Sequence, residues 1–231
     1  MAYVYPQHMR ATRDLMRRRN HLMRKRAELF AHTQNTASQY NLQIPLGRIA
    51  TPQNREGLLD RFDDPAVKMS IAANLEMIAA YDRVLEALEK DIVSNAKEHD
   101  PTAYALLKTI PGVGRIIALD LLYEIEDINR FPRVQDFASY CRLVKCPKES
   151  NGKKYGTSGK KIGNAHLRWA FSQAAQLFLK SNEPGKQLYS KLTNKHGKGK
   201  ALSILAHKLG RAVYFMLKKR EAFNMAKFLT E

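Results

Sequence analysis

Apolar side chains recur at every seventh residue along two long stretches of the chain. The first stretch spans about residues 7–41 and the second about residues 67–99. A repeat of seven places its apolar positions on one stripe of a helix, which then pairs with a second helix along that stripe. The stripe residues are Met9, Leu15, Met16, Leu22, Met23, Leu29 and Phe30 in the first stretch, and Ile71, Ile78, Leu85 and Ile92, with Tyr81 and Leu88 offset and Asn74 and Asn95 as polar breaks, in the second.

A connector separates these two predicted helices. Residues 42–66 contain three prolines and two glycines, which do not sustain a helix, and leave room for one short turn around Leu58 and Leu59. The helices are expected to pair as an antiparallel hairpin or with the helices of another subunit, and a homo-oligomer is expected through the coiled coil. Basic residues cover the other faces of the first helix. These faces are expected either to be exposed to solvent or to lie alongside a phosphate backbone. The residues are Arg10, Arg13, Arg17, Arg18, Arg19, Arg24, Lys25 and Arg26.

The next stretch has the pattern of two short helices joined by a glycine turn. Residues 104–110 and 115–125 are apolar and helix-like, and the sequence Pro-Gly-Val-Gly at 111–114 lies between them. This resembles a helix-hairpin-helix motif, whose turn exposes backbone N–H groups to a DNA phosphate without reading sequence. An ordinary corner between two helices would show the same pattern.

Helical patterns also account for most of the remaining chain. A short helix is expected at 134–143, and after residues 146–164 three helical runs follow, beginning at 165, after Pro184-Gly185, and at 201, with Asn164 as a candidate N-cap. No strand pattern is evident. The predicted fold is all-α: a long antiparallel coiled-coil hairpin in residues 1–102, followed by a compact helical domain in residues 103–231.

Positive charge is concentrated in the second half of this predicted helical domain. The whole chain has a formal net charge of +17, and residues 141–220 hold 19 Lys and Arg against only two Glu. Such a one-sided field favours a polyanion, with binding that weakens steeply as salt rises. No apolar run is long enough to span a bilayer, the N-terminus lacks a signal-peptide layout, and two cysteines make no disulfide framework, so a cytosolic protein is expected.

Residues 146–164 form a basic, glycine-rich segment that is read as a loop. It contains five lysines and four glycines, which suit it to surround an anion, although a solvated surface loop has a similar composition. A serine among these lysines is suited to attack a phosphodiester, because the cations stabilise the phosphoryl oxygens, but no base for it is evident. A nucleotide-binding P-loop fails at Lys154 and Lys161. A metal site from Cys141, Cys146 and His166 lacks a fourth ligand with a recognised spacing, and Cys141 is expected to be a packed apolar residue.

A set of motifs in fixed order resembles the C-terminal transposase domain of the insertion-sequence family usually called IS-one-ten. The resemblance covers about residues 104–225, and the heptad helices resemble the coiled coil of that family. The motifs are Leu-Lys-Thr-Ile-Pro-Gly-Val-Gly at 107–114, Phe-Ala-Ser-Tyr-Cys-Arg-Leu at 137–143, Ser-Asn-Gly-Lys at 150–153, Gly-Asn-Ala-His-Leu-Arg at 163–168 and Lys-His-Gly-Lys-Gly-Lys-Ala at 195–201.

The resemblance implies a DNA recombinase that forms a covalent phosphoserine with the cut strand. The position of the family's serine falls on Ser150, with Ser158 as the runner-up. The resemblance also implies action in the nucleoid of a prokaryotic cytoplasm, oligomeric assembly, and a structured guide RNA encoded by the element. The family begins with an RNase-H-like domain whose acidic residues bind a divalent metal such as Mg²⁺. Here the residues from Met1 resemble the exit from that domain, so we expect a C-terminal fragment, a decayed gene copy or a trimmed version, which alone would bind DNA or RNA without supporting full strand exchange.

The expected function is therefore DNA binding and strand transfer within an insertion-sequence transposase. The alternative is a non-catalytic nucleic-acid-binding or architectural helical protein. In either case the contacts to DNA are expected from glycines at the turn, basic side chains and one helix N-cap: Gly112, Gly114, Arg115, Lys153, Lys154, Lys160, Lys161, Asn164, Arg168, Lys198 and Lys200.

Overall fold

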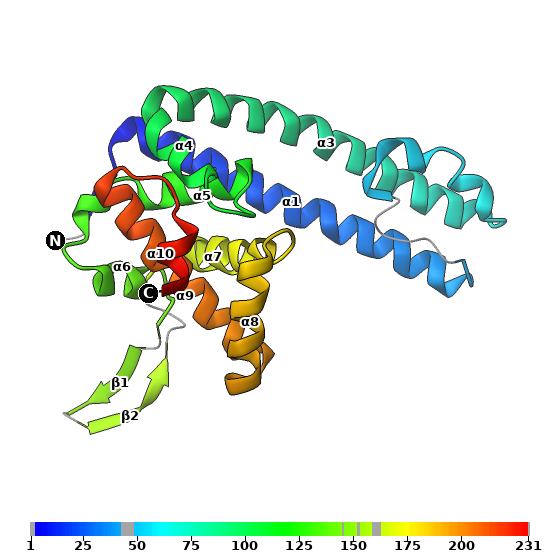
Figure 1. The fold of residues 1–231 in the computed structure, drawn as a ribbon. Helices are drawn as coiled ribbons and strands as arrows, with labels where there is room; N and C mark the ends of the chain where they lie inside the picture. The colour runs from blue at the N-terminus through cyan, green and yellow to red at the C-terminus, as the bar shows by residue number, and fades with distance from the viewer. Residues whose placement is uncertain (1–2, 43–48, 145, 152, 159–162, 231) are drawn as a thin grey trace. The chain divides into compact units, whose positions relative to one another are not determined.

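The computed structural model describes residues 3–42, 49–144, 146–151, 153–158 and 163–230, shown in Figure 1. These residues form two compact units. The smaller unit comprises Asp14–Val93, and the larger unit comprises Met1–Arg13 together with Ser94–Glu231. Most of the described chain is helical, in agreement with the predicted fold class. Within the described ranges, no helix combines the length and the apolar character needed to cross a membrane.

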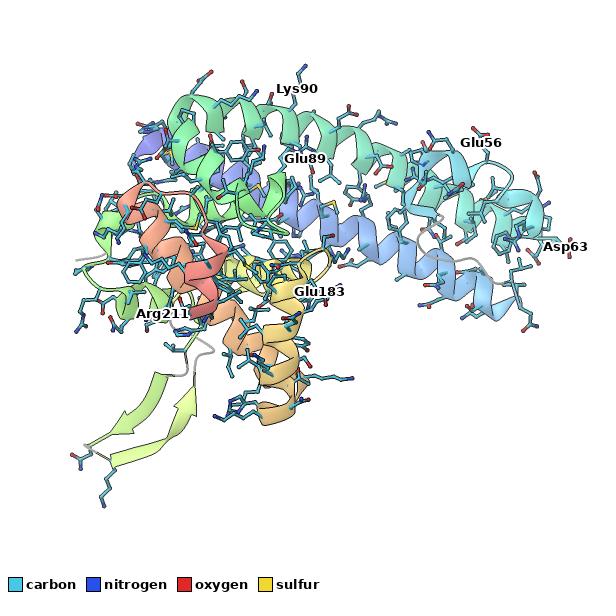
Figure 2. The ribbon with its side chains drawn as sticks, in the orientation of Figure 1. Glu56, Asp63, Glu89, Lys90, Glu183 and Arg211 are labelled. Atoms are coloured by element: carbon cyan, nitrogen blue, oxygen red, sulfur yellow. The ribbon has the colours of Figure 1, made fainter. Side chains whose placement is uncertain are left out.

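Two long helices, α1 (Gln7–Gln39) and α3 (Pro65–His99), supply the smaller unit. Residue numbers rise along α1 while those of the contacting residues on α3 fall. Arg19 pairs with Glu89, Arg26 with Asp82, and Thr33 with Asn74. Figure 2 shows Glu89 on α3. The two helices are therefore antiparallel within this unit. The four apolar positions at sevens in α3 are all buried, as the repeat predicts: Ile71, Ile78, Leu85 and Ile92.

The buried stripe of α1 includes polar residues that the heptad pattern did not predict. Thr33 is fully buried and Arg19 is only 8% exposed, whereas the predicted stripe residues Leu15 and Leu29 are only partly buried. Two guanidinium nitrogens of Arg19, Nε and Nη2, donate to the same oxygen of Glu89, at 2.9 and 2.7 Å. The assignment of Arg19 to a solvated face was wrong, because its charge is matched by a carboxylate on the partner helix.

The connector packs on the end of this helix pair. It contains two short 3-10 helices, η1 (Pro52–Arg55) and η2 (Leu59–Arg61), the second close to the turn expected around Leu58. Leu58 and Phe62 are buried in one cluster with Phe30 and Ile71. The apolar positions of the connector thus extend the core between the helices.

The larger unit is a packed group of helices and one β-hairpin. In chain order its elements are α4 (Pro101–Lys108), α5 (Arg115–Ile125), η3 (Ile128–Arg130), α6 (Val134–Tyr140), β1 (Cys146–Ser150), β2 (Lys153–Ser158), α7 (Ala165–Phe178), α8 (Glu183–His196), α9 (Lys198–Lys219) and α10 (Met225–Thr230). Helix α7 packs against both α5 and α9. The largest fully buried side chains here are Leu107, Leu119, Leu121, Tyr123, Phe137, Phe171 and Phe178.

The hairpin corrects the prediction of a loop without strands. Strands β1 and β2 pair antiparallel, with Ser150 opposite Lys153 and Cys146 opposite Ser158. Asn151 lies in the turn between them with φ +49°. In Figure 1 the two strands extend away from the helices. A two-stranded ribbon of this kind needs no apolar face, so hydrophobic alternation could not reveal it.

Candidate nucleic-acid interface

The β-hairpin places the two candidate serines at opposite ends. Ser150 adjoins the turn, where its register partner is Lys153, and Ser158 lies at the base, opposite Cys146. With about 3.3 Å per strand residue, the four steps from Ser150 to Cys146 correspond to about 13 Å along β1. The side chains of both serines and of Lys154 lie outside the described residues, as do Lys160 and Lys161 altogether, whereas Lys153 is exposed. The two serines therefore lie too far apart along the hairpin to belong to one site, and each is a separate candidate for the nucleophile.

The two ends of the hairpin segment are joined by what we call the hairpin stem, formed by residues 140–142 and 163–164. The backbone N–H of Asn164 donates to the carbonyl oxygen of Tyr140 at 2.6 Å, and Arg142 Nε donates to the carbonyl oxygen of Gly163 at 3.1 Å. Gly163 has φ +88°, and a Cβ there would lie 2.5 Å from the Tyr140 oxygen. Only glycine allows so close an approach with this backbone. The stem thus holds together the two chain segments that flank the hairpin.

Asn164 connects the stem to a buried carboxylate. Its Oδ1 accepts hydrogen bonds from the N–H groups of His166 at 2.8 Å and Leu167 at 3.1 Å, which confirms the predicted N-cap of α7. Its Nδ2 donates to Glu124 Oε2 at 2.7 Å. Asn164 is only 8% exposed and Glu124 only 2%. The structure gives this asparagine a structural role, and its predicted contact with DNA stays a prediction.

Arg130 and two tyrosines complete the polar network behind the stem. Tyr5 Oη donates to the Glu124 carbonyl oxygen at 2.9 Å, and Arg130 Nη2 donates to Tyr5 Oη at 3.1 Å. The Arg130 guanidinium also lies over the rings of Phe131 and Tyr140, at 4.5 and 4.7 Å from their centroids. Tyr5 could not be found from patterns along the sequence, because it lies more than 100 positions from its partners Glu124 and Arg130.

The network changes the acidity of its tyrosines in opposite directions. Burial and the hydrogen bond with Tyr140 raise the pKa of Tyr5 to about 12. Burial also acts to raise the pKa of Tyr140, but hydrogen bonds involving Tyr5, Asn164 and Arg130, together with the Arg130 charge, outweigh it and lower that pKa. The cationic Arg130 is thus accommodated by a set of polar and aromatic groups at the base of the hairpin.

Two acidic residues of α5 are buried, although carboxylates in a helix are more often solvated. Asp120 is 1% exposed and Glu124 is 2% exposed. Among the residues that the structure describes, no group of three or more His, Cys, Asp or Glu side chains could hold a metal ion. Cys141 is fully buried, as expected for a packed apolar residue, and burial raises the pKa of its thiol. We therefore assign no metal ligands to the described part of the chain.

The glycine turn between α4 and α5 lies at the other end of α7. Gly112 has φ +80°, and a Cβ there would lie 2.4 Å from the carbonyl carbon of Leu177 and 2.5 Å from the nitrogen of Phe178. Because Glu124 at the end of α5 contacts Asn164 at the start of α7, the two helices are antiparallel. The 14 residues of α7 extend about 20 Å, so the turn and the hairpin stem would reach different phosphates.

The remaining predicted contacts lie at helix starts. Gly114 is the N-cap of α5 and Arg115 begins that helix, both exposed. Arg168 is exposed in the first turn of α7, near the hairpin stem. Lys198 and Lys200 are exposed in the first turn of α9. The structure therefore brings Lys153, Asn164 and Arg168 onto the hairpin or the helix that follows it, and places the other described contacts on separate elements.

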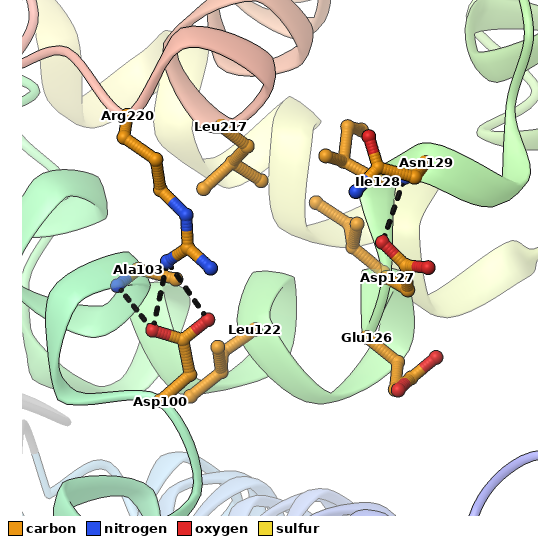
Figure 3. A pocket seen from close by; sticks show the side chains of 10 residues that line it. Asp100, Ala103, Leu122, Glu126, Asp127, Ile128, Asn129, Leu217 and Arg220 are labelled. Carbon is orange, nitrogen blue, oxygen red and sulfur yellow. Dashed lines mark hydrogen bonds and ion pairs between the residues drawn. The ribbon is translucent and has the colours of Figure 1, made fainter.

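A pocket in the larger unit has the wrong charge for a phosphate. It has a volume of about 190 Å³ and is lined by Asp100, Glu126, Asp127 and Arg220 among other residues. Figure 3 shows Arg220 reaching both carboxylate oxygens of Asp100, each at 3.0 Å. Asp127 accepts from the backbone N–H of Asn129 at 2.8 Å. With its one arginine already paired, this pocket would repel a phosphodiester.

Comparison with known proteins shows that this chain is similar in sequence to transposases. The family model described as "Transposase IS116/IS110/IS902 family" matches residues 104–190. The transposase for insertion sequence element IS1111A of Coxiella burnetii is 26% identical over 147 residues, which cover 62% of this chain and 40% of that protein. The uncharacterized 44.8 kDa protein of insertion element IS116 of Streptomyces clavuligerus is 25% identical over 164 residues, covering 64% and 38%.

A third relative matches nearly the whole chain. The transposase for insertion sequence element IS1328 of Yersinia enterocolitica is 24% identical over 232 residues, which cover 97% of this chain and 68% of that protein. The chain spans about two fifths of the length of the first two relatives. The matched family region, residues 104–190, includes the glycine turn, the hairpin and the whole of α7.

Proposed function

We propose that this chain, which by its match over residues 104–190 belongs to the IS116/IS110/IS902 family of transposases, binds the DNA of an insertion sequence and carries the serine that cuts and rejoins it. The observation that carries the proposal is that the matched region contains a basic hairpin with Ser150 beside its turn, flanked by the two segments that form the stem. The place of action would be the DNA of the nucleoid.

DNA binding would rest on charge and on helix starts. The excess of cations in residues 141–220 includes those of the hairpin, and the N-termini of α5, α7 and α9 each present a partial positive charge. Exposed Lys153, Arg168, Lys198 and Lys200 would neutralise phosphates without reading sequence. The Lys154, Lys160 and Lys161 side chains would add to this charge.

The proposed reaction transfers a phosphoryl group of the DNA from a deoxyribose oxygen to the serine oxygen. Ser150 Oγ attacks the phosphorus of a phosphodiester, the bond from phosphorus to one deoxyribose oxygen breaks, and a phosphoserine forms. The serine proton leaves to a base, and the departing oxygen takes up a proton to become a hydroxyl. A hydroxyl of another strand reverses these changes and rejoins the DNA. Ser158 is the second candidate for the same step.

We propose that the ligands of the metal ion used in this reaction lie outside the described residues. By resemblance, an acidic RNase-H-like domain would hold Mg²⁺, which would stabilise charge on the phosphoryl oxygens. Among the described residues, no group of three or more His, Cys, Asp or Glu side chains could hold this ion. We also propose that a structured RNA encoded by the element binds the protein. Sequencing of RNA that co-purifies with the chain tests this, and RNA unrelated to the element would refute it.

Trapping of covalent adducts tests the serine. The chain is mixed with labelled DNA of the element's ends, with a family acidic domain and Mg²⁺ supplied in trans. We expect a protein–DNA adduct from the unmodified chain, none from Ser150→Ala, and an undiminished yield from the matched control Ser158→Ala. DNA binding, followed by fluorescence anisotropy, should be the same for all three. Adducts that persist in Ser150→Ala and vanish in Ser158→Ala would move the role to Ser158.

The same experiment separates transposition from simple binding. Tight DNA binding with no adduct in any variant, under conditions where a full-length relative forms one, would favour a non-catalytic nucleic-acid-binding protein. A chain that binds none of the DNAs, with or without salt, would refute both functions.

We also propose that the chain self-associates through the outer stripe of α3. We define this stripe by apolar residues spaced by three or four positions on the face away from the buried heptad: Met69, Ala73, Met77, Ala80, Val84 and Ala87. Met69 is 75% exposed, and Met77 and Val84 about half exposed. Both signs of charge flank the stripe, on Arg83 and Glu86, so two antiparallel copies could pair without repulsion.

Substitutions on the stripe test this association. Met77→Glu with Val84→Glu should shift the chain to the monomer in analytical ultracentrifugation, because four buried carboxylates would then face one another across the contact. The control Lys90→Glu, exposed on the same helix but off the stripe, should leave the oligomer intact. An unchanged sedimentation coefficient in the double variant would rule out this surface.

A further inference from the structure

We infer that Trp169 stacks on an unpaired base of bound nucleic acid beside the hairpin stem. The inference deepens the proposed function and rests on it, since it names the form of nucleic acid that the transposase would hold. The evidence is the exposure of the residue, the composition of its helix face and its position next to the stem.

The chain's one tryptophan is exposed on a helix that is otherwise well packed. Trp169 is 45% exposed, whereas its neighbours Leu167, Ala170 and Phe171 are buried in the core of the larger unit. An indole at the surface leaves a large apolar area in water, and such residues are enriched where proteins bind partners. The exposure therefore indicates that a partner covers this ring.

The surroundings of Trp169 favour an anionic partner. Helix α7 contains no Asp or Glu, and Arg168, adjacent to the tryptophan, is exposed. The N-terminal end of α7 also carries the partial positive charge of the helix dipole. Gln173 and Gln176 on the same side of the helix offer amide groups rather than charge. A nucleic acid can contact both parts of this surface, because its phosphates pair with the cationic groups and a base can stack on the indole ring.

General helix geometry directs the Trp169 ring toward the start of α7. Long side chains in helices lean toward the N-terminus, so Trp169 is expected to cover the turn at Ala165, whose methyl group is too small to hide a ring face. The residues immediately before that turn, Gly163 and Asn164, belong to the hairpin stem. A base stacked here would therefore lie beside the hairpin stem.

The partner base must be unpaired. Inside a duplex both faces of each base are already covered by its neighbours, so away from duplex ends the ring can stack only on a base in a single strand or one displaced from the helix. Stacking of this kind tolerates any base, because every base has a π face. The inference therefore predicts a preference for unpaired strands without a preference for sequence.

Intrinsic fluorescence tests the inference, since all tryptophan emission comes from residue 169. The probes are a single strand of thymidines, a strand of equal length with abasic sites, and a blunt duplex. All three should bind, as followed by anisotropy of a dye on the DNA, but only the thymidine strand should strongly quench the emission. Equal quenching by the abasic strand would overturn the inference, since phosphates alone would then explain it.

Substitution gives a second readout. Trp169→Ala should weaken binding of the thymidine strand about 5- to 100-fold while leaving the abasic strand and the duplex unchanged, and Trp169→Phe should retain part of the affinity. The control Tyr40→Ala removes another half-exposed aromatic ring, from the smaller unit, and should change none of the three. Circular dichroism checks that each variant is folded.

The outcomes separate this inference from the proposed function. If no probe binds, DNA binding itself is refuted. If all bind equally and Trp169→Ala has no effect on the thymidine strand, only the stacking is refuted. A uridine strand that quenches while the thymidine strand does not would assign the base to an RNA and support the stacking. Emission that changes with protein concentration alone would instead place a second copy of the chain on the ring and overturn the inference.

Discussion

Gly112→Ala is expected to lower the free energy of unfolding of the larger unit by about 3 kcal/mol. Two costs add at this position. A Cβ would lie within 2.6 Å of three backbone atoms of Leu177 and Phe178, and backbone atoms at the end of a packed helix cannot move aside as a flexible side chain can. The residue also has φ +80°, a region that alanine adopts only with strain. Urea unfolding followed by circular dichroism measures the change.

Gly114→Ala is the matched control for Gly112→Ala. Gly114 lies two residues further along the same turn, with φ −81°, and no atom lies within 4 Å of the position its Cβ would take. Gly114→Ala should lower the free energy of unfolding by about 1 kcal/mol or less, as other changes at a helix N-cap do. If both variants are equally stable and Gly112→Ala loses only DNA affinity, the turn serves phosphate binding and its packing on α7 is unimportant.

The repeat of seven in α3 was a reliable guide because its cause is local. Ile71, Ile78, Leu85 and Ile92 fall on one side of any helix that contains them, and all four are buried. In α1 the same pattern was less accurate. Arg19 and Thr33 occupy buried positions because Glu89 and Asn74 on α3 meet them, and a partner's sequence cannot be read from the helix itself.

The hairpin was missed although a short signal for it is present. Asn151-Gly152 lies between the two strands, and an Asn-Gly pair is the strongest sequence signal for a two-residue hairpin turn. The glycines of this segment also suit an anion-binding loop, and the segment lacks the apolar alternation that usually marks strands. The pairing of Ser150 with Lys153 shows that the turn residues were the better guide.

The polar network behind the stem could not be predicted from patterns along the chain. The Asn164 N-cap was found, because an N-cap acts on the residues that follow it. Its second partner, Glu124, lies 40 positions away, and Tyr5 is 119 positions from Glu124. A buried carboxylate in a helix resembles a solvated one in sequence. Only the fold shows that the Glu124 side chain lies against Asn164 in the hairpin stem.

That shared role of Asn164 leads to a prediction with a quantitative control. Asn164→Ala should lower the free energy of unfolding by about 3 kcal/mol, because it removes an N-cap and leaves the buried Glu124 without this hydrogen-bond donor. Asn182→Ala removes a comparable buried N-cap, that of α8, where the asparagine oxygen accepts from the N–H of Gly185 at 3.1 Å. Asn182 contacts no carboxylate in the described structure, so this control should cost only about 1 kcal/mol.

A double-mutant cycle with Glu124→Gln isolates the contact between Glu124 and Asn164. If the hydrogen bond to Glu124 causes the larger loss, Asn164→Ala should cost less in the Glu124→Gln background, because a neutral amide loses less than a carboxylate when its partner is removed. Equal losses in both backgrounds, measured by urea unfolding, would reduce Asn164 to a helix cap. The loss of coupling should also weaken DNA binding, because the stem that orients the hairpin would no longer be held against α5.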